Sequence, residues 1–389
     1  MTLLSFFALI LTAMSLSLGA AAQAMIVPAP PAIAASSYIL IDANSGAVLM
    51  SGNADERIPP ASLSKLMTAY VAEVELAAGR LNLNDRVRIS EKAWRTGGSK
   101  MFVLVNDEVR VEDLMRGIVI QSGNDASIAI AEHVAGDEAN FAIMMNQFAQ
   151  QILMQNTRFG NATGLPASMT ELDPGYTTAR DMVILARHKI KDHPQFYLWH
   201  SEQDFTFAGI TQANRNRLLW QNPAVDGLKT GFTADSGYSL VASAEQDGMR
   251  LITAVMGAAT AEVRFTETQK MLGYGFRFFE TPALFDAHQS IREVRVWGGA
   301  QDLLQLGLPE DLFVTIPRGA RPELRQQFTL IEPLNAPIEA GDVMGRIIVT
   351  HGDQVLADEP LLALHAVARG GLMKRGMDRV RRLIHDFRN

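Results

Sequence analysis

Alternating apolar and polar positions predict a β-hairpin at the start of the chain body. The stretch SYILID at residues 37–42 alternates as a strand does, Asn44-Ser45-Gly46 provides a turn, and AVLM at residues 47–50 returns. Two later runs, YSLVASA at residues 238–244 and MRLITAVMG at residues 249–257, surround an Asp-Gly turn and form a second hairpin pattern. The pattern therefore predicts two antiparallel strand pairs.

Apolar residues at helical spacing predict helices between and after these hairpins. One follows Pro59-Pro60 and continues to about Gly79. The other expected helices run from Val111 to Ile120, from Asp125 to near Gly136, from Thr177 onward, and from Gln269 to Phe279. The helical pattern breaks at Gln121-Ser122-Gly123-Asn124, where polar side chains are free to project into a cleft.

Beyond Ala287 the helical spacing disappears and short strand-like runs take its place. These runs are IREVRVWGG, DLFVTIPRG, QQFTLIE, VMGRIIVTHG and LLALHAV. Short strands separated by turn residues are typical of a β-sandwich, here of about 80 residues. Thr281-Pro282 marks the expected boundary between this region and the preceding one.

The N-terminus has the pattern of a secretory signal. Residues 3–18 are nearly all apolar, and Ala22-Gln23-Ala24 provides an A-x-A cleavage site, so cleavage is expected before Met25. No Lys or Arg precedes the apolar run. An uncleaved N-terminal anchor is the alternative, and the chain body is exported under either interpretation.

The C-terminus combines apolar residues at helical spacing with a high density of cations. Residues 369–389 carry seven basic and two acidic residues, a net charge of +5, while the whole chain carries −7 and the remainder therefore −12. Charged residues interrupt the apolar run too often for a membrane span. The pattern favours a basic amphipathic helix on an anionic membrane surface, and a docked helix with a solvated basic face is the alternative.

Composition limits the chemistry that the chain can perform. The 389 residues, 48% hydrophobic and 20% charged, suffice for two or three domains of about 150 residues each. Zero cysteines exclude disulfides, a thiol nucleophile and a cysteine-bound metal. The eight histidines form no H-E-x-x-H or other metal-ligand spacing, and there is no G-x-S-x-G elbow. We therefore expect no metal, cofactor or nucleic-acid partner.

Ser62 and Lys65 are the first candidate pair for catalysis. Side chains at i and i+3 share a helix face and can touch. Lysine is a base only when its amine is neutral, and burial or a nearby cation lowers its pKa from about 10.4. S-x-x-K occurs by chance about once in a chain of this length. A helix cap followed by a solvated lysine is therefore the alternative.

Two further motifs strengthen the catalytic interpretation. Ser122-Gly123-Asn124 lies at the break between two helices, and Lys229-Thr230-Gly231 precedes a strand hairpin and supplies a second cation. Gly231 allows the backbone to approach a ligand closely. S-x-x-K, S-x-N and K-T-G in this order are the motif set of penicillin-binding proteins and β-lactamases.

The chain resembles the low-molecular-mass penicillin-binding proteins that are serine-type D-alanyl-D-alanine carboxypeptidases. The resemblance covers essentially the whole chain and includes PASLSKLMTAY, IQSGNDASIAIAEHVAG, FGNATGLP, TTARDM, NRNRLLW, VDGLKTG and GFRFFET. It implies an α/β (α+β) fold of the serine β-lactamase/transpeptidase type with a helical subdomain and an antiparallel sheet. A small β-sandwich and an amphipathic C-terminal helix would follow.

The resemblance also implies a role for each motif residue. Ser62 would be the nucleophile that forms an acyl-enzyme, and Lys65 would accept its proton. Ser122 would relay a proton to the leaving D-alanine, and Asn124 would hold the substrate amide and orient Lys65. The expected substrate-binding residues, several of them around the terminal carboxylate, are Lys229, Thr230, Gly231, Phe232, Thr233, Arg215 and Arg264.

Phe232 and the segment from Arg95 to Lys100 depart from the family pattern. The oxyanion hole would consist of the backbone N–H groups of Ser62 and Phe232, so Phe232 would act through its backbone. Its side chain departs from the family, whose members often have a polar residue after K-T-G. The segment from Arg95 to Lys100 is short, and in the family this neighbourhood influences deacylation.

The implied substrate is the pentapeptide stem of peptidoglycan, with β-lactam antibiotics as covalent inhibitors and no cofactor. The implied location is the periplasmic face of the bacterial inner membrane. The expected division is a signal peptide at 1–24, a linker at 25–35, a transpeptidase-like catalytic domain at 36–284, a β-rich domain at 285–368 and a cationic amphipathic membrane-anchoring helix at 369–389.

Three other functions compete with carboxypeptidase activity. A β-lactamase needs a deacylation glutamate in an E-x-x-L-N loop, and the nearest stretch, Glu171-Leu172-Asp173-Pro174, does not match. A non-catalytic peptidoglycan-binding protein has no reason to keep all the reactive side chains. A transpeptidase is disfavoured by analogy, because the chain lacks a large additional module.

Overall fold

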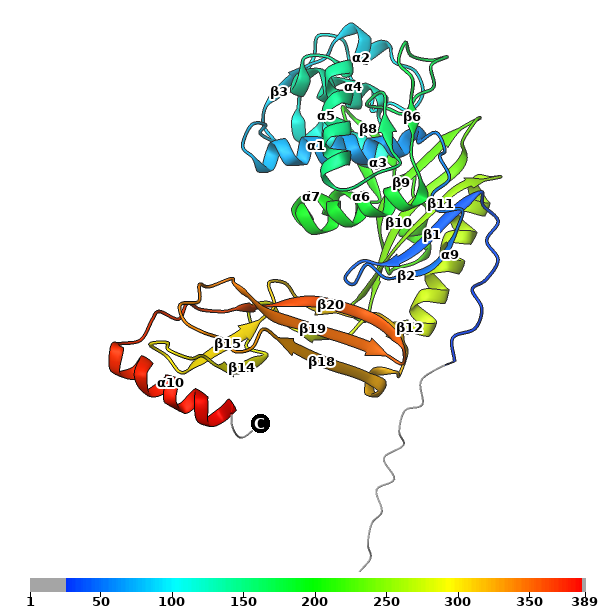
Figure 1. Cartoon of the computed structure of the whole chain (residues 1–389). Coiled ribbons are helices and arrows are strands. Elements are labelled where there is room, and N and C mark those ends of the chain that lie inside the picture. Colours follow the sequence, from blue (N-terminus) through cyan, green and yellow to red (C-terminus); the bar gives the residue numbers. More distant parts are fainter. Residues whose placement is uncertain (1–25, 387–389) are drawn as a thin grey trace, which may run out of the picture.

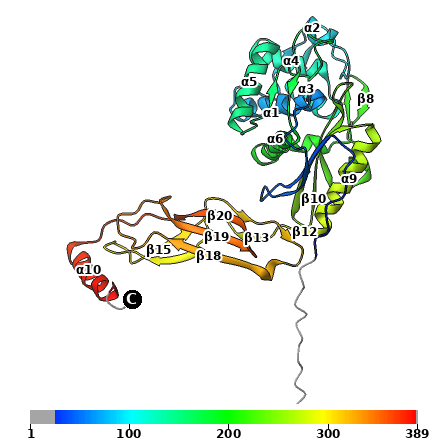
Figure 2. The same ribbon diagram turned by 45° about the vertical axis from the view of Figure 1, so that its right-hand side comes forward.

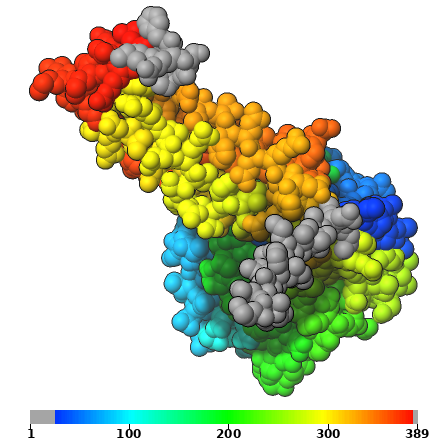
Figure 3. Space-filling model, turned by 90° about the horizontal axis from the view of Figure 1, so that it is seen from below, coloured from blue at the N-terminus to red at the C-terminus, as the bar shows by residue number. Residues whose placement is uncertain are grey.

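The computed structural model describes residues 26–386 and consists of a mixed α/β domain followed by a β-rich domain. Figures 1 and 2 show the β-rich domain projecting from one side of the α/β domain and ending in helix α10 (Leu372–Asp386), far from the α/β domain. Figure 3 shows the same projection from below. The predicted signal peptide at residues 1–24 lies outside the described residues.

An antiparallel sheet of five strands is the centre of the α/β domain. Its strand order is β2-β1-β11-β10-β9. Both predicted hairpins, β1–β2 and β10–β11, are present, and β1 pairs with β11 so that the hairpins lie side by side. The strands are β1 Ser37–Asp42, β2 Val48–Gly52, β9 Val225–Thr233, β10 Gly237–Gln246 and β11 Met249–Ala258.

Helices cover both faces of this sheet, and strand β1 shows why. Ile39 and Ile41 belong to the core shared with α6 (Ala179–Asp192), whereas Leu40 belongs to the core shared with α9 (Ala261–Phe278). Successive strand residues point to opposite faces, so a strand with apolar residues at successive positions is buried on both sides. The sheet is therefore the middle layer of the domain.

The predicted helices are confirmed, with some ends moved. Helix α9 begins at Ala261 rather than at Gln269, because its first turns, AEVRFTET, contain too few apolar residues to show the pattern. Thr260 caps it by accepting a hydrogen bond from the backbone N–H of Val263. The K-T-G motif lies within strand β9, which directly precedes the β10–β11 hairpin, as the pattern predicted.

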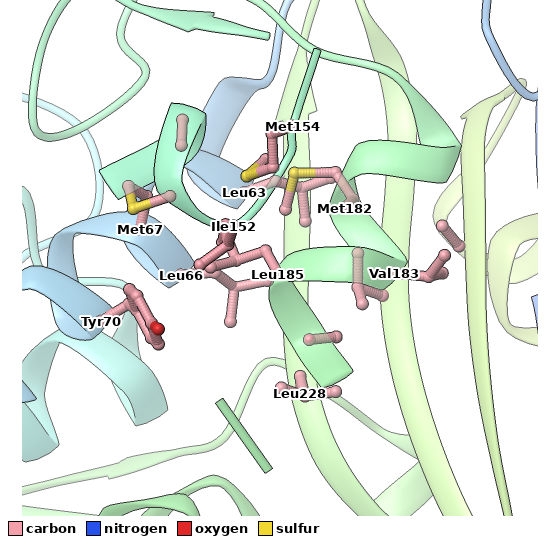
Figure 4. Packing of buried hydrophobic residues seen from close by; sticks show 14 of the residues in the cluster. Leu63, Leu66, Met67, Tyr70, Ile152, Met154, Met182, Val183, Leu185 and Leu228 are labelled. Atoms are coloured by element: carbon pink, nitrogen blue, oxygen red, sulfur yellow. The ribbon is translucent and has the colours of Figure 1, made fainter. Parts of the chain in front are cut away.

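The helical part packs against the sheet through α1 (Ser64–Ala77) and α6. Figure 4 shows Leu66 and Tyr70 of α1 in the same cluster as Leu185 and Met182 of α6. The other helices are α2 Glu91–Arg95, α3 Val111–Gln121, α4 Asn124–Ala135, α5 Glu138–Gln151, α7 Pro194–Tyr197 and α8 Leu218–Gln221. The short strands are β3 Arg86–Arg88, β4 Glu108–Arg110, β5 Arg158–Phe159, β6 Gly175–Tyr176, β7 Asp204–Phe207 and β8 Ile210–Ala213, and the 3₁₀ turns are η1 Ala61–Leu63, η2 Leu198–Ser201 and η3 Arg321–Glu323.

The β-rich domain contains a five-stranded antiparallel sheet in the order β14-β15-β20-β19-β18, with two two-stranded pairs, β12–β17 and β13–β16. Together they enclose a separate apolar core. The strands are β12 Phe279–Glu280, β13 Ala283–Phe285, β14 Arg292–Arg295, β15 Leu303–Gly307, β16 Leu312–Phe313, β17 Ile316–Pro317, β18 Leu324–Leu330, β19 Val343–His351 and β20 Gln354–Ala363. The fold class expected from the sequence is confirmed.

Polar contacts join the two domains. Thr281 donates to the buried carboxylate of Asp42 at 2.8 Å, and Ser45 and Thr315 hydroxyls lie 2.6 Å apart. Lys191 forms an ion pair with Glu310 at 2.8 Å. This joint lies at the β1–β2 turn, so the β-rich domain contacts the edge of the α/β domain.

Candidate active site

Ser62 and Lys65 are brought together where η1 leads into α1. The Lys65 Nζ atom lies 3.1 Å from Ser62 Oγ and donates a second hydrogen bond to the Thr163 carbonyl oxygen at 2.8 Å. Lys65 is only 1% exposed. Burial lowers the pKa of Lys65 to about 7; Asp125 and Glu138 oppose this shift and Arg215 adds to it. The amine is therefore able to accept a proton from Ser62 near neutral pH.

The backbone around Ser62 is tightly constrained. Ala61 has φ +48°, a left-handed conformation that costs a non-glycine residue about 1–3 kcal/mol. A Cβ atom on Gly164 would lie 1.7 Å from the Ala61 carbonyl oxygen, so only glycine fits opposite this turn. The loop that carries Gly164 therefore presses directly against the serine turn.

The same loop supplies Thr163, a site residue that the sequence reasoning missed. The Asn161 side chain accepts hydrogen bonds from the backbone N–H groups of Thr163 at 3.1 Å and Gly164 at 2.6 Å. This turn presents the Thr163 carbonyl to Lys65. The stretch FGNATGLP contains the turn, and its Asn-x-Thr-Gly pattern is the signal from which the loop could have been found.

Ser122 and Asn124 lie at the break between α3 and α4, as the helical pattern predicted. Both are nearly fully buried, and Ser122 adopts a left-handed conformation with φ +62°. Within the described part of the chain, the Ser122 hydroxyl and the Asn124 Oδ1 atom have no hydrogen-bond partner. The Asn124 Nδ2 group donates to the Gly97 carbonyl at 2.7 Å, so Asn124 also holds the neighbouring loop.

Asp125 strengthens the connection between this motif and that loop. Its fully buried carboxylate accepts hydrogen bonds from the backbone N–H groups of Met101 at 3.0 Å and Phe102 at 2.9 Å. Glu138, on the other side, accepts a hydrogen bond from the Ala162 N–H at 3.1 Å. These two carboxylates hold the loops around Lys65 while raising its pKa.

Strand β9 brings a second buried lysine to the site. Lys229 is 2% exposed and donates to the Thr230 carbonyl at 3.0 Å. Burial, followed by the charges of Lys65, Arg215 and Arg264, lowers the pKa of Lys229 well below its ordinary value. Lys65, Arg215 and Arg264 are therefore the cations whose charges act on Lys229.

Gly231 is needed because β9 passes directly beside the serine turn. A Cβ atom at Gly231 would lie 3.1 Å from Leu63 Cγ and 3.4 Å from the Pro60 carbonyl oxygen. The close approach is therefore to the segment that carries Ser62. Phe232, next along the strand, is half exposed and stacks on Tyr238 with ring centroids 4.2 Å apart. Thr233 donates to the Ser236 hydroxyl at 2.8 Å and closes the turn after β9.

Arg264 reaches this strand from α9. Its Nη1 group donates to the Gly231 carbonyl at 3.2 Å, and its guanidinium carbon lies 5.5 Å from the centre of the Tyr238 ring. Burial is the main cause that lowers the pKa of Arg264 to about 10; the Tyr238 charge opposes the shift, and Arg217 and Arg215 contribute to it. Arg264 is thus a buried cation held against the strand edge.

Arg215 and Arg217 belong to a segment in which asparagine and arginine alternate. Asn214 and Asn216 are buried, and Asn216 donates to the Gly227 carbonyl at 2.9 Å, while both arginines are exposed. The buried asparagines hold the segment and leave the arginines to face outward. The Arg217 charge contributes to the lowered pKa of Arg264, and the alternation N-R-N-R is the signal that could have pointed to it.

The structure thus gathers residues from distant parts of the chain around one cationic site. A serine and a lysine of lowered pKa lie in contact, and a second lysine and arginines make the site cationic. Within residues 26–386 no group of three or more His, Asp or Glu side chains is arranged to hold a metal ion. The arrangement fits nucleophilic attack by a serine on a substrate that carries a carboxylate.

Comparisons with known proteins point to one family. Residues 24–260 match the family described as D-alanyl-D-alanine carboxypeptidase, and residues 279–369 match the C-terminal domain of penicillin-binding protein 5. D-alanyl-D-alanine carboxypeptidase DacC of Escherichia coli is 44% identical, over 92% of this chain and 90% of its own length. The Haemophilus influenzae enzyme DacA is 42% identical, over 90% of this chain and 89% of its own.

Solved structures give the same result. Penicillin-binding protein 5 from Haemophilus influenzae has a TM-score of 0.82 and 42% identity, with 88% of this chain and all of that chain covered. Penicillin-binding protein D2 from Listeria monocytogenes, solved in an ampicillin-bound form, has a TM-score of 0.58 and 30% identity, over 63% of this chain and 98% of that one.

Proposed function

The chain belongs to the D-alanyl-D-alanine carboxypeptidase family of penicillin-binding proteins, and we propose that Ser62 is the nucleophile with which it removes the terminal D-alanine from peptidoglycan pentapeptide stems. The family membership makes the protein a hydrolase. One observation carries the assignment of Ser62: its Oγ atom lies 3.1 Å from Lys65, whose pKa is lowered to about 7. A neutral amine still has N–H groups for Thr163 and a free lone pair for the serine proton.

Acylation begins when Lys65 takes the hydroxyl proton and Ser62 Oγ attacks the carbonyl carbon of the penultimate D-alanine. The backbone N–H groups of Ser62 and Phe232 hold the oxyanion, and the close packing of β9 against the serine turn supports this pairing. Loss of one oxyanion donor typically lowers the rate by about 10²–10³-fold. The tetrahedral intermediate then collapses and the C–N bond breaks.

The leaving D-alanine amine needs a proton as that bond breaks. Ser122 relays it, assisted by Lys229, and its buried hydroxyl has no other hydrogen-bond partner in the described part of the chain. A water molecule then attacks the acyl-enzyme, releases the tetrapeptide and returns the proton to Ser62. Both half-reactions use the same basic lysine at the same serine.

The cations of the site bind the terminal carboxylate of the substrate. Lys229 and Arg264 are buried, and Arg215 is exposed at the rim. Thr230 and Thr233 add hydroxyl groups from the strand edge. Asn124 holds the stem amide and orients Lys65 through its unpartnered Oδ1 atom, while its Nδ2 group holds Gly97.

β-Lactam antibiotics are the expected covalent inhibitors, because they acylate the same serine. The ampicillin and cefotaxime complexes of the Listeria monocytogenes relative support this inference. The β-lactam carboxylate would occupy the site of the substrate carboxylate. The adduct on Ser62 would persist when water attacks it slowly.

The direct test of Ser62 is the release of D-alanine from a peptide ending in D-Ala-D-Ala. The chain from Met25 to Asn389 is compared with its Ser62→Ala variant, and with Ser64→Ala as a matched control. Release by the parent and by Ser64→Ala, but not by Ser62→Ala, supports the assignment. Release by Ser62→Ala at the parent rate would contradict it, and rapid turnover of penicillin would indicate a β-lactamase.

The parts outside the catalytic domain attach the enzyme to the periplasmic face of the inner membrane. We divide the chain into a signal peptide at 1–24, a linker at 25–35, a catalytic domain at 36–284, a β-rich domain at 285–368 and a membrane-anchoring helix at 369–389. No helix within residues 26–386 is long and apolar enough to cross a bilayer. Peripheral attachment through α10 is therefore the proposed mode.

The orientation of α10 supports this attachment. Five of its apolar side chains are 55–86% exposed, whereas Asp378 on the opposite side is 2% exposed. The exposed residues are Leu372, Met373, Met377, Val380 and Leu383. An apolar helix face bordered by cations binds the interface of an anionic membrane. Sedimentation with anionic vesicles, lost when the chain stops at Arg369, tests the proposal.

A further inference from the structure

Helix α10 lies at the end of the β-rich domain far from the α/β domain (Figure 1). A cationic cavity of about 510 Å³ lies between α10 and the β-rich domain. Arg369, just before the helix, lines it together with Arg375, Arg379 and Arg382 of α10. Asp378 is the only carboxylate among the described lining residues. The lining is therefore strongly positive, in a chain whose remaining part is acidic.

Asp378 is already engaged with the β-rich domain. Its Oδ2 atom accepts a hydrogen bond from the Gly298 N–H at 3.0 Å, and its Oδ1 atom lies 3.8 Å from Arg295. Lys374 adds an ion pair with Asp302 at 3.0 Å. The helix is thus fixed to the domain by its polar side. Among the described residues, no carboxylate forms an ion pair with Arg369, Arg375 or Arg379.

The cavity opens beside the apolar side of the helix. Leu372 lines the cavity and is 84% exposed, and it begins the apolar stripe. Arg375 and Arg379 follow at i+3 and i+7, so they border this stripe on the cavity side. A ligand with a negative head and apolar tails would therefore find both surfaces adjacent to each other.

We propose that this cavity binds the headgroup phosphate of an anionic phospholipid, with the acyl chains along the apolar side of α10. The inference rests on the proposed membrane attachment and adds a defined site to it. Guanidinium groups pair with phosphate oxygens in a bidentate manner, which adds geometric specificity to the charge attraction. A zwitterionic headgroup carries a cation that the arginines repel. The site therefore predicts a preference for anionic over zwitterionic headgroups that diffuse attraction to a basic helix does not give.

Two single-charge variants separate a site from diffuse attraction. Arg379→Gln removes a cavity arginine, and Arg381→Gln removes an exposed arginine of the same helix outside the cavity lining. Binding of Met25–Asn389 chains is measured on phosphatidylcholine vesicles containing phosphatidylglycerol. If the attraction is diffuse, both variants should lose the same vesicle affinity, about fivefold for each charge removed. We expect Arg379→Gln to lose at least about fivefold more than Arg381→Gln, and equal losses would overturn the proposal.

A soluble probe keeps the two proposals distinguishable. Dihexanoylphosphatidylglycerol, below its micelle concentration, is titrated into the parent chain and into Arg369→Gln, a variant outside the helix. Saturable binding that Arg369→Gln weakens supports the cavity, even when vesicle attachment of the parent fails. No saturable binding, or equal binding of dihexanoylphosphatidylcholine, overturns the cavity. Competition by inorganic phosphate at equal concentration would overturn the assignment to a lipid.

Discussion

Two lysines are buried to the same extent in this molecule, but their amines bond different kinds of group. One amine bonds a carboxylate, and the other bonds uncharged oxygens. Lys65 on α1 and Lys189 on α6 are each 1% exposed. Lys189 donates to the Glu73 carboxylate at 2.6 Å. Among residues 26–386, the hydrogen-bond partners of the Lys65 amine are two uncharged oxygens, the Ser62 hydroxyl and the Thr163 carbonyl. Burial disfavours the charged form of both amines, but only Lys189 of the two is bonded to a carboxylate, which favours the charged form.

The electrostatic causes of the pKa shifts of Lys65 and Lys189 differ in the same way. Burial lowers the pKa of both lysines, but for Lys189 the charge and hydrogen bond of Glu73 oppose that shift. For Lys65 the opposing carboxylates, Asp125 and Glu138, hold backbone groups of neighbouring loops and do not bond the amine. The α1–α6 pair is therefore structural, whereas Lys65 is available for chemistry.

The largest expected effect is on acylation. Lys65→Gln removes the proton acceptor and should slow acylation of Ser62 by about 10²–10⁴-fold, the usual contribution of a general base. Stopped-flow measurement with a fluorescent penicillin gives the rate. The fold should be retained, because an uncharged side chain replaces a buried amine. A loss below tenfold would contradict the proposed role.

Breaking the structural pair should affect stability instead. Glu73→Gln leaves the Lys189 charge buried without its partner and should lower the free energy of unfolding by about 3–5 kcal/mol. Denaturant unfolding measures this loss. The double variant Glu73→Met/Lys189→Met is the control and should recover most of it. Release of D-alanine per folded molecule should stay within twofold of the parent; a large loss there would give Lys189 a catalytic role.

The acylation rate and the free energy of unfolding should both depend on pH through Lys65. Acylation should rise about tenfold per pH unit up to the Lys65 pKa of about 7, because the base must first lose its proton. Unfolded Lys65 keeps its proton up to about pH 10.4, so the unfolded chain binds more protons above pH 7. The Lys65 contribution to stability should therefore increase with pH across that window. An acylation rate that does not change between pH 5 and 8 would contradict a neutral Lys65.

The smallest predicted effect concerns Arg215. Its charge contributes to the lowered pKa of Lys65, so Arg215→Gln should move the acid limb of the acylation profile to higher pH. The limb is measured at saturating penicillin, where weaker carboxylate binding does not contribute. Arg277→Gln, on the outer end of α9, is the matched control and should leave the limb in place. A shift to lower pH would show that Arg215 acts in another way.

The local sequence pattern predicted those features of the site that depend on residues close together in the chain. The contact between Ser62 and Lys65 follows from their i, i+3 spacing, although Ser62 lies in a 3₁₀ turn before the helix. The Ser122 break follows from the end of the apolar run. Resemblance to the family, rather than pattern, supplied Arg264 and Thr233.

Long-range packing supplied what the pattern could not. Thr163 reaches Lys65 from a loop 98 residues away, and the sequence around neither residue indicates this contact. Lys189 has the sequence context of a solvated helix residue, and only the α1–α6 packing shows that it is buried against Glu73. The start of α9 was missed because its first turns are polar.

The ionisation state of the two buried lysines is the most direct test of this comparison. Lysines labelled with ¹³C at Cε are titrated by NMR, and Lys65→Arg and Lys189→Arg variants assign the two signals. We expect the Lys65 signal to titrate with a midpoint at about pH 7. We expect the 2.6 Å ion pair with Glu73 to keep the Lys189 signal that of an ammonium at that pH. A Lys65 signal that stays charged beyond pH 9 would contradict its role as the base that activates Ser62.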